Sequence, residues 1–336
     1  MQKAEWLAQI QEEIIEPELK ICDPHHHLWD YEHDRYLLDE MLVDTSSGHN
    51  VVSTVFMECA SEYRAHGPDA EKSLGETEFV TKIAQESEKR VLALVAKTKV
   101  CEAIVGFADL ELGFSVKDIL EQHMKAADGR FRGLRHAASW HKSEAIRNAH
   151  TNPPEHLMLD KTFREGFSVL GELDLSFDAW FYHHQLPEFV DLARAFPETT
   201  IILDHFGGPL GIGPYSDKAD AVFKEWKDLI SPLSDLDNVF FKLGGLNMPV
   251  NGFGWHKNTL PPTSNEIVEK TARYYEHVIN LAGTKRCMFE SNFPVDKTSV
   301  SFPILWNAFK KMASTYTDQE KADLFYDTAA KVYRLG

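Results

Sequence analysis

Two histidines one residue apart stand at the end of the first strand-like run of the chain, Asp23-Pro24-His25-His26-His27. Side chains two residues apart on a strand share a face, so we expect His25 and His27 to point one way and His26 the other. Two buried imidazoles on one face are costly unless something uses them, and together they suit one divalent metal ion or one substrate carbonyl. The pattern predicts a site that needs further partners.

Other ionisable or amide side chains end later apolar runs in the same way. They are Glu58, Arg132, Arg135, His183, Asp204, His205, Lys242, Glu290 and Asn292. Each residue type also has a structural interpretation, because a single histidine is often only hydrogen-bonded and a buried carboxylate such as Glu58 is often paired with an arginine. Arg132 and Arg135 suit either a salt bridge or a substrate carboxylate. Their repeated position at the ends of runs favours a shared site.

The elements that must position these residues alternate regularly. Apolar, β-branched runs predict strands over residues 19–27, 51–60, 101–110, 131–140, 177–184, 199–206, 238–246 and 287–293. Helical spacing predicts helices over 76–89, 116–127, 161–172, 187–195, 219–230, 265–282, 302–314 and 318–333. Such alternation favours a parallel sheet closed as a (β/α)8 TIM barrel, in which catalytic groups lie at the carboxyl ends of the strands. A doubly wound open sheet is the rival, but no glycine-rich phosphate turn follows the first four strands.

The remaining segments are assigned more simply. Residues 1–18 predict a short amphipathic helical extension, and the acidic stretch 31–50 predicts a loop. The glycines between Gly207 and Gly213 could cradle an anion, although shaping a turn is the simpler role. Because no repeat or linker interrupts the chain, we expect one domain over residues 1–336.

Composition excludes several classes of function. The chain has 336 residues, 43% hydrophobic and 26% charged, which is typical of a globular protein. No apolar stretch is long enough for a membrane helix, and the charged N-terminal segment does not resemble a signal peptide. The four cysteines are scattered singly, which favours reduced thiols and a cytoplasmic setting. A net charge of −17 argues against nucleic-acid or membrane partners, whereas a homo-oligomer remains open.

Six motifs resemble one known family. They are DPHHHLWD at 23–30, FRGLRH at 131–136, FDAWFYHHQLPEFVDLARAFP at 177–197, LDHFGGP at 203–209, FKLGGL at 241–246 and CMFESNFPVDK at 287–297. Together they are similar to the amidohydrolase superfamily, and most of all to its branch of 2-pyrone-4,6-dicarboxylate and sugar-acid lactonases. The resemblance implies a barrel that hydrolyses esters or lactones, with a metal in most members. It also implies that His25, His27 and His183 are metal ligands.

The chain departs from this family in two places. Strand four has no lysine to form a carbamylated bridge, so two metal ions are not expected. Strand eight usually carries an aspartate in a GSDWP-like motif, whereas this chain reads Glu290-Ser291-Asn292-Phe293-Pro294. Asparagine cannot accept a proton from water, but Glu290 lies two residues earlier and therefore on the same strand face. We expect Glu290 either to replace the missing base or to form a structural ion pair.

The leading hypothesis is hydrolysis of a small lactone or ester that bears a carboxylate, at one divalent ion, most simply zinc. His25, His27 and His183 would hold the ion, with His205 as a further ligand or proton carrier. Glu290 would take the proton from water and Asn292 would orient that water. The residues expected to bind the small anionic substrate are Arg132, Arg135, Glu58 and Lys242. Metal-free hydrolysis, a decarboxylase on the same barrel, and a catalytically silent binding barrel are the alternatives.

Overall fold

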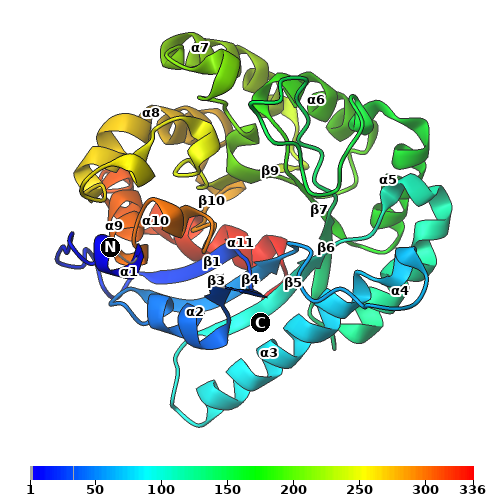
Figure 1. The fold of residues 1–336 in the computed structure, drawn as a ribbon, viewed down its shortest axis with the longest axis horizontal. Helices are drawn as coiled ribbons and strands as arrows, with labels where there is room; N and C mark the ends of the chain where they lie inside the picture. The colour runs from blue at the N-terminus through cyan, green and yellow to red at the C-terminus, as the bar shows by residue number, and fades with distance from the viewer. Residues whose placement is uncertain (1–2, 33) are drawn as a thin grey trace.

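Eight parallel strands form one sheet that curls into a barrel (Figure 1). The computed structural model describes residues 3–32 and 34–336. In their order around the sheet the strands are β1 (Lys20–His26), β4 (Asn50–Met57), β5 (Lys99–Gly106), β6 (Phe131–Arg135), β7 (Ser176–Ala179), β8 (Ile201–Leu203), β9 (Val239–Leu243) and β10 (Cys287–Phe289). The two edges meet where His27 N donates to Phe293 O at 2.7 Å and Asn292 N donates to His25 O at 3.0 Å. The predicted (β/α)8 barrel is confirmed.

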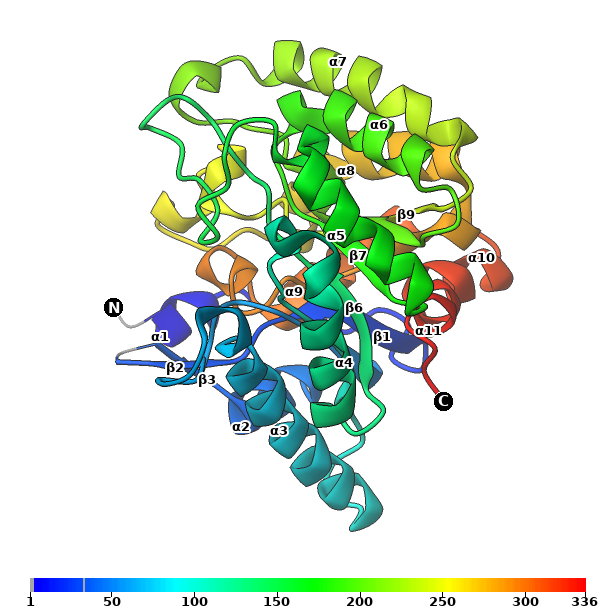
Figure 2. The same cartoon turned by 90° about the vertical axis from the view of Figure 1, so that its right-hand side faces the viewer.

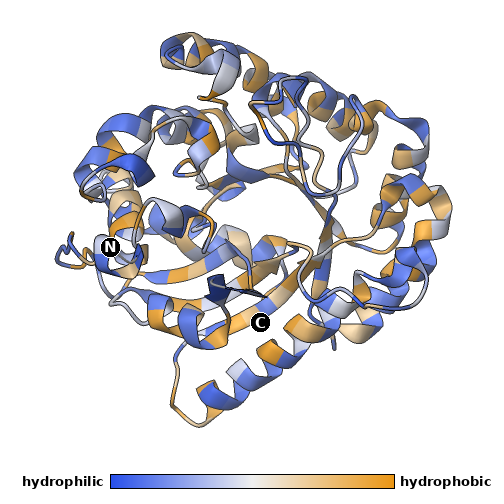
Figure 3. Cartoon of the chain, viewed as in Figure 1, coloured by the Kyte–Doolittle hydropathy of each residue, from blue (hydrophilic) through white to orange (hydrophobic). Residues whose placement is uncertain are grey.

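Helices surround this barrel. They are α3 (Leu74–Leu92), α4 (Val116–Ala126), α5 (Lys161–Glu172), α6 (Leu186–Ala195), α7 (Ala219–Ile230), α8 (Ser264–Ala282) and α9 (Phe302–Met312), followed by α10 (Asp318–Ala322) and α11 (Thr328–Val332). Hydrophilic and hydrophobic residues alternate along them (Figure 3), as expected for helices with one face on a core. Over the residues that the structure describes, no helix is long and apolar enough to cross a membrane. The last predicted helix is interrupted by a π-helical turn at Asp323–Asp327.

The barrel interior has an apolar half and a charged half. Near the amino ends of the strands, inward residues such as Cys22, Val55 and Met288 pack against Tyr333 and α11. Figure 2 shows α11 and the C-terminus on one side of the molecule and the hairpin of β2 (Trp29–Tyr31) and β3 (Asp34–Tyr36) on the other. The C-terminal segment therefore plugs one end of the barrel, which leaves the carboxyl ends of the strands for the site.

The predicted short N-terminal helix is present as α1 (Lys3–Leu7), but the described residues between it and β1 form no further helix. Residues of this segment form hydrogen bonds with distant helices. Ile15 N donates to Asn307 Oδ1 at 3.0 Å, and Lys310 Nζ donates to Glu16 O at 2.8 Å. These tertiary hydrogen bonds replace the intrahelical ones, so the local helical pattern does not decide the conformation.

The stretch 31–50, predicted as a loop, contains a helix. Helix α2 (Leu38–Thr45) is capped where the Glu40 carboxylate accepts from Leu37 N at 2.9 Å. Tyr36 donates from its hydroxyl to Asp44 at 2.7 Å and holds the helix against the β2–β3 hairpin. The acidic residues that favoured a loop thus serve as a cap and an anchor.

Candidate active site

Ionisable side chains gather inside the barrel at the carboxyl ends of the strands. They come from β1 (His25), β6 (Arg135), β7 (Asp178) and β9 (Lys242), and from the turns after β8 (Asp204, His205) and β10 (Glu290), and each is at most 5% exposed. Strand ends on this face are where barrel enzymes hold their catalytic groups. These residues lie at the end of the strands where the sequence predicts a shared site.

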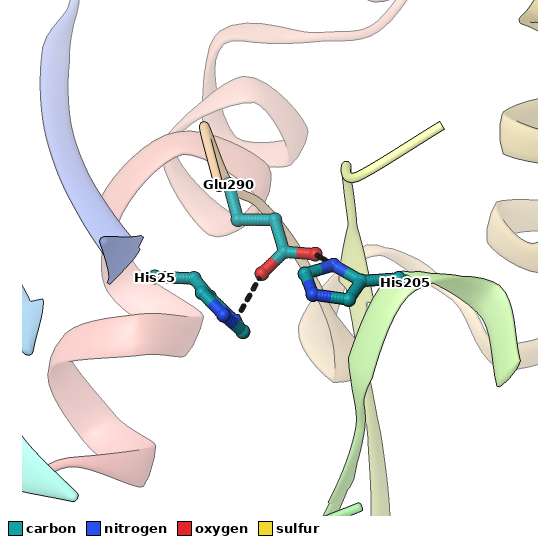
Figure 4. A group of neighbouring side chains, drawn as sticks. All are labelled: His25, His205 and Glu290. Atoms are coloured by element: carbon teal, nitrogen blue, oxygen red, sulfur yellow. Dashed lines mark hydrogen bonds and ion pairs between the residues drawn. The ribbon is translucent and has the colours of Figure 1, made fainter. Parts of the chain in front are cut away.

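Glu290 lies between two histidines at the centre of the site (Figure 4). Its Oε2 is 2.8 Å from His25 Nδ1, and its Oε1 is 2.6 Å from His205 Nδ1. Burial alone would raise the pKa of this carboxyl, but the adjacent His205 and His25 outweigh burial and lower the pKa to about 2. Glu290 is therefore an ionised carboxylate that accepts from His205 and lies beside the imidazole of His25.

The same contacts fix the proton of one of the two rings. His205 Nδ1 donates to Glu290 Oε1, because an ionised carboxylate can only accept. His25 has a donor at each nitrogen, since Arg135 lies 3.3 Å from its Nε2 and Lys242 lies 3.3 Å from its Nδ1. Burial lowers the pKa of His25 well below its usual value, so the ring is neutral. The Nε2 lone pair of His205 is thus left for a group in the pocket that this ring lines.

The backbone around His205 explains how its ring is positioned. His205 and Phe206 have positive φ values of 50° and 60°, which are uncommon for residues with a side chain. Gly245, which follows β9, has no Cβ, and a Cβ there would lie 2.3 Å from His205 Nδ1. Gly245 of FKLGGL therefore makes room for the His205 ring, and Gly244 makes room for Glu290. Such left-handed conformations are frequent at functional sites.

A hydrogen-bonded pair holds β1 against the end of β10. Ser291 donates to Asp23 from its backbone N at 2.9 Å and from its hydroxyl at 2.5 Å. All three of these groups are buried, and the contacts lie directly beside His25 and Glu290. This pair therefore sets the distance between the histidine and the carboxylate.

Lys242 lies beneath the histidines as a buried cation. Its Nζ donates to Asp178 at 2.6 Å and lies 3.4 Å from Asp204, and the Tyr333 hydroxyl also donates to Asp178 at 2.6 Å. Burial would lower the pKa of Lys242, but the two aspartates outweigh burial and raise it. Lys242 does not line the pocket, so the structure gives it the role of charge partner for Asp178 and Asp204 rather than of the predicted substrate ligand.

We expect Lys242→Met to lower the free energy of unfolding by about 3–5 kcal/mol, because it leaves two buried carboxyl groups without their cation. Urea unfolding followed by circular dichroism measures this change. The matched control is Lys117→Met, which removes an exposed ion pair with Glu172 and should leave the free energy of unfolding nearly unchanged. Equal losses in the two variants would contradict the structural role of Lys242.

Arg135 is held by Glu58, as one of the two sequence-based interpretations has it. Its Nε donates to Glu58 Oε1 at 2.7 Å, while His150 Nε2 lies 3.0 Å from Glu58 Oε2. Burial would raise the pKa of Glu58, but Arg135 and His150 outweigh burial and lower it to about 2. Glu58 thus orients Arg135, which lines the pocket. A guanidinium has five N–H donors, so Arg135 can donate to other groups besides Glu58.

Asn292 lies at the pocket surface, two residues after Glu290. Its backbone has a φ of 54°, and its amide donates to Asp296 Oδ1 at 3.0 Å. Asn247 N donates to the other oxygen of Asp296 at 3.1 Å, so the carboxyl is fixed from both sides. The Asn292 amide is therefore held in a constant orientation beside His205.

Two predicted site residues lie elsewhere. Arg132, near the start of β6, donates to Tyr333 O at 2.9 Å and shares a hollow with Lys99 and Gly336 at the amino ends of the strands. The predicted substrate-binding role of Arg132 is therefore corrected. His183 follows β7 in a 3-10 turn, where its ring packs on Tyr215 with centroids 5.1 Å apart, because β7 ends earlier than predicted.

His27 lines the pocket, whereas His25 does not line it and belongs to the cluster with Glu290 and His205. The Nδ1 of His27 lies 2.9 Å from the Met57 carbonyl, so that nitrogen carries the proton and Nε2 keeps its lone pair. Burial lowers the pKa of His27 to about 3, so the ring is neutral. Its ring centroid is 5.0 Å from that of His25. The shared face of the HxH pair agrees with its strand spacing.

The donors of this site suit a divalent cation. Among the described residues, His25, His205 and Glu290 each offer a ligand atom, all within 4.8 Å of one another, and this group includes neither His27 nor His183. Both carboxylate oxygens of Asp204 are buried there without a hydrogen bond. Two imidazoles and carboxylates are ligands that zinc accepts. The residues present therefore fit a metal ion, and the cluster that fits it holds His205 and Glu290 beside His25, whereas the predicted ligands His27 and His183 lie outside that cluster.

Sequence analysis assigned no role to Asp178, Asp204 or Arg147. A carboxylate inside the apolar run at Asp178 is the same signal that singled out Glu58, so it could have been found. Arg147 lies in an irregular loop, where no periodic pattern shows which side chains reach the pocket.

Comparison with known proteins agrees with this fold. The Amidohydrolase family model matches residues 22–335. An uncharacterized protein of Sinorhizobium fredii is 31% identical over 340 residues, covering 95% of this chain and 99% of the relative. An L-fucono-1,5-lactonase of Burkholderia ambifaria is 24% identical over 218 residues, covering 65% of this chain and 64% of the relative.

Among solved structures, an amidohydrolase of Burkholderia multivorans with bound zinc has a TM-score of 0.70 at 21% identity, covering 94% of this chain and 99% of its own. At this identity the likeness concerns the fold. The barrel and its rim of histidines and carboxylates define the class of protein, and the family match names it. The chain belongs to the amidohydrolase family.

Proposed function

We propose that this protein hydrolyses a small lactone or ester that carries a carboxylate. The observation that carries the proposal is the pair formed by Glu290 and His205, in which a buried carboxylate holds one ring nitrogen and leaves the other for the pocket. A histidine oriented in this way is a general base for water. The pair supports hydrolysis because this reaction requires water to lose a proton.

The proposed reaction proceeds in two proton transfers. His205 Nε2 takes a proton from water while the water oxygen bonds to the carbonyl carbon, and the Glu290 carboxylate stabilises the resulting imidazolium. Arg135 donates to the developing oxyanion, with the Asn292 amide beside it. When the tetrahedral carbon expels the ring oxygen, His205 returns its proton to that oxygen, giving an acid and an alcohol.

This assignment changes the predicted role of Glu290. The sequence made Glu290 the group that takes the proton from water, but both of its oxygens contact histidines and it does not line the pocket. We propose that Glu290 acts through His205 instead.

The same side chains are the proposed ligands of one divalent ion, most simply zinc. When bound, such an ion supplies Lewis-acid polarisation of a carbonyl or a water of lowered pKa. His25, His205 and Glu290 would hold it, with Asp204 adding negative charge.

We expect purified protein to bind Zn²⁺ with about one equivalent per chain, measured by calorimetry after exhaustive chelation. His25→Gln should weaken that affinity by about 10- to 100-fold or more, because the set of ligands loses an imidazole. His183→Gln, which lies outside the cluster, is the matched control and should bind as the wild type does. Equal weakening in both variants, or no binding by the wild type, would contradict the proposed ligands.

The reaction is tested with a panel of carboxylated lactones in H₂¹⁸O. Hydrolysis releases one acid group per turnover and places one ¹⁸O in the product, as seen by titration and mass spectrometry. Release of CO₂ without ¹⁸O would replace this proposal with a decarboxylase. Ligand binding without turnover across the panel would replace it with the silent binding barrel.

A further inference from the structure

The pocket above His205 has two chemically different sides. It encloses about 640 Å³ and opens at the carboxyl ends of the strands, with His27, Arg135 and Asn292 near its base. A volume of this size holds a molecule larger than a simple lactone ring. The groups that surround the remaining space therefore select the substrate.

One side of the pocket is apolar. It is formed by Ile212 after β8, by Met248, Pro249 and Val250 after β9, and by Val295 after β10. None of these side chains offers a hydrogen bond to a ligand. A polyhydroxylated sugar ring placed there would lose hydrogen bonds to water without replacement, at about 1–3 kcal/mol for each unpaired group. This side favours an aryl or branched alkyl group.

The other side carries an arginine whose charge is not used inside the protein. Arg147 lines the pocket from the loop after β6, and its backbone carbonyl accepts from the Tyr182 hydroxyl, which fixes the loop. Within residues 3–32 and 34–336, its guanidinium makes no hydrogen bond or ion pair. Arg135, by contrast, is engaged by Glu58 and His25.

The charge of the whole chain makes this arginine more significant. The net charge is −17, so most surface arginines have a carboxylate within reach. Arg147 places a positive charge at the mouth of the pocket. The other polar groups of the pocket are the ones proposed to lie near the bond that is hydrolysed. A free guanidinium there can form a two-point contact with a carboxylate.

We infer that the substrate is an amphiphilic carboxylate, with its carboxylate on Arg147, its reacting carbonyl at His205 and an aryl or branched alkyl group against Met248 and Val250. The reaction in this statement rests on the proposed function, whereas the binding mode does not. Sugar acids are disfavoured because they present hydroxyl groups to the apolar side. Arg147 is thus a specificity-determining residue and takes no part in the proton transfers.

Binding can be measured without turnover because two tryptophans report on this pocket. Trp29 and Trp180 both line it, and Trp29 stacks on His27 with ring centroids 6.0 Å apart and planes 18° apart. The probes are 3-phenylpropionate, its neutral amide 3-phenylpropionamide, acetate and gluconate, each titrated against tryptophan fluorescence and calorimetry. We expect 3-phenylpropionate to bind at least tenfold more tightly than gluconate or acetate.

Variants separate the two halves of the inference. Arg147→Gln should weaken 3-phenylpropionate by about 10- to 100-fold and leave 3-phenylpropionamide unchanged, because only the carboxylate contact is lost. Lys142→Gln removes a positive charge from the same loop outside the pocket and should change affinity less than twofold. Met248→Gln should weaken 3-phenylpropionate several-fold and leave acetate unchanged.

Two results would overturn the inference. One is tighter binding of gluconate than of 3-phenylpropionate, and the other is the same affinity for 3-phenylpropionate in Arg147→Gln and Lys142→Gln. The outcome is independent of the proposed reaction. Tight, Arg147-dependent binding with no lactone hydrolysed would support the inferred binding mode and contradict the proposed hydrolase. Hydrolysis confined to sugar lactones would support the hydrolase and contradict the inferred substrate class.

Discussion

Glu290→Gln is expected to lower kcat by about 10³- to 10⁴-fold, with the fold unchanged. The carboxylate accepts the Nδ1–H of His205 at 2.6 Å, and its other oxygen lies 2.8 Å from His25 Nδ1. An amide accepts at its oxygen but donates at its nitrogen, so a glutamine whose nitrogen faces His205 makes that ring reverse its tautomer, and in either orientation the negative charge that would stabilise the imidazolium is lost. If His205 turns its proton to Nε2, it cannot accept one from water. A tautomer error of this kind costs a histidine base about 10⁴-fold in the serine proteases.

The measurement is kcat on the best lactone of the panel, with the unfolding midpoint of each variant as a check on the fold. Glu172→Gln is the matched control, since its carboxylate is exposed and paired only with Lys117. It should retain wild-type kcat. If Glu290→Gln also retained wild-type kcat, the result would exclude both direct and indirect participation of Glu290 in proton transfer.

The second large effect is expected at His205. His205→Gln removes the imidazole whose Nε2 is the proposed base in the pocket. We therefore expect kcat to fall by about 10²- to 10⁴-fold, the range of general base catalysis. His183→Gln is the control, because sequence reasoning placed this histidine in the site and the structure does not. It should keep kcat near the wild-type value.

A double variant tests whether the two residues act as one unit. Because Glu290 takes part in the proposed proton transfer only through His205, the variant with both changes should be no slower in chelated protein than the worse single one. Independent losses that multiply in zinc-loaded protein would report the proposed role of Glu290 in holding the ion. Zinc affinity measured on the same variants distinguishes these two cases.

Local sequence patterns were sufficient for features that depend only on neighbouring residues, such as the face of a strand or the ends of a helix. Strand spacing predicts that His25 and His27 share a face, and their ring centroids lie 5.0 Å apart, with His27 lining the pocket and His25 in the cluster around Glu290. The same rule applied to strand eight singled out Glu290 as the carboxylate nearest to the absent aspartate. Helices α5 and α7 begin and end at the predicted residues because their apolar stripes are regular.

Local sequence patterns failed where the end of a strand, or a contact with a distant residue, determines the position of a side chain. Strand β7 ends at Ala179, so His183 leaves the barrel face before it can join the site. Arg132 is three residues from Arg135, and the two arginines serve opposite ends of the barrel. Tyr333 contributes to the buried charge network from the end of the chain. No local signal contains these relations.

The sequence by itself determined the barrel, the family and the end of the strands at which the polar residues collect. Periodicity and motifs record these features directly, because each depends on which face of an element is buried. Only the tertiary structure decided what each residue does. The proposed role of Glu290 depends on the two histidines beside it, and that of Arg147 depends on a guanidinium without a partner among the described residues. Both conditions arise where distant strand ends and loops meet at one rim.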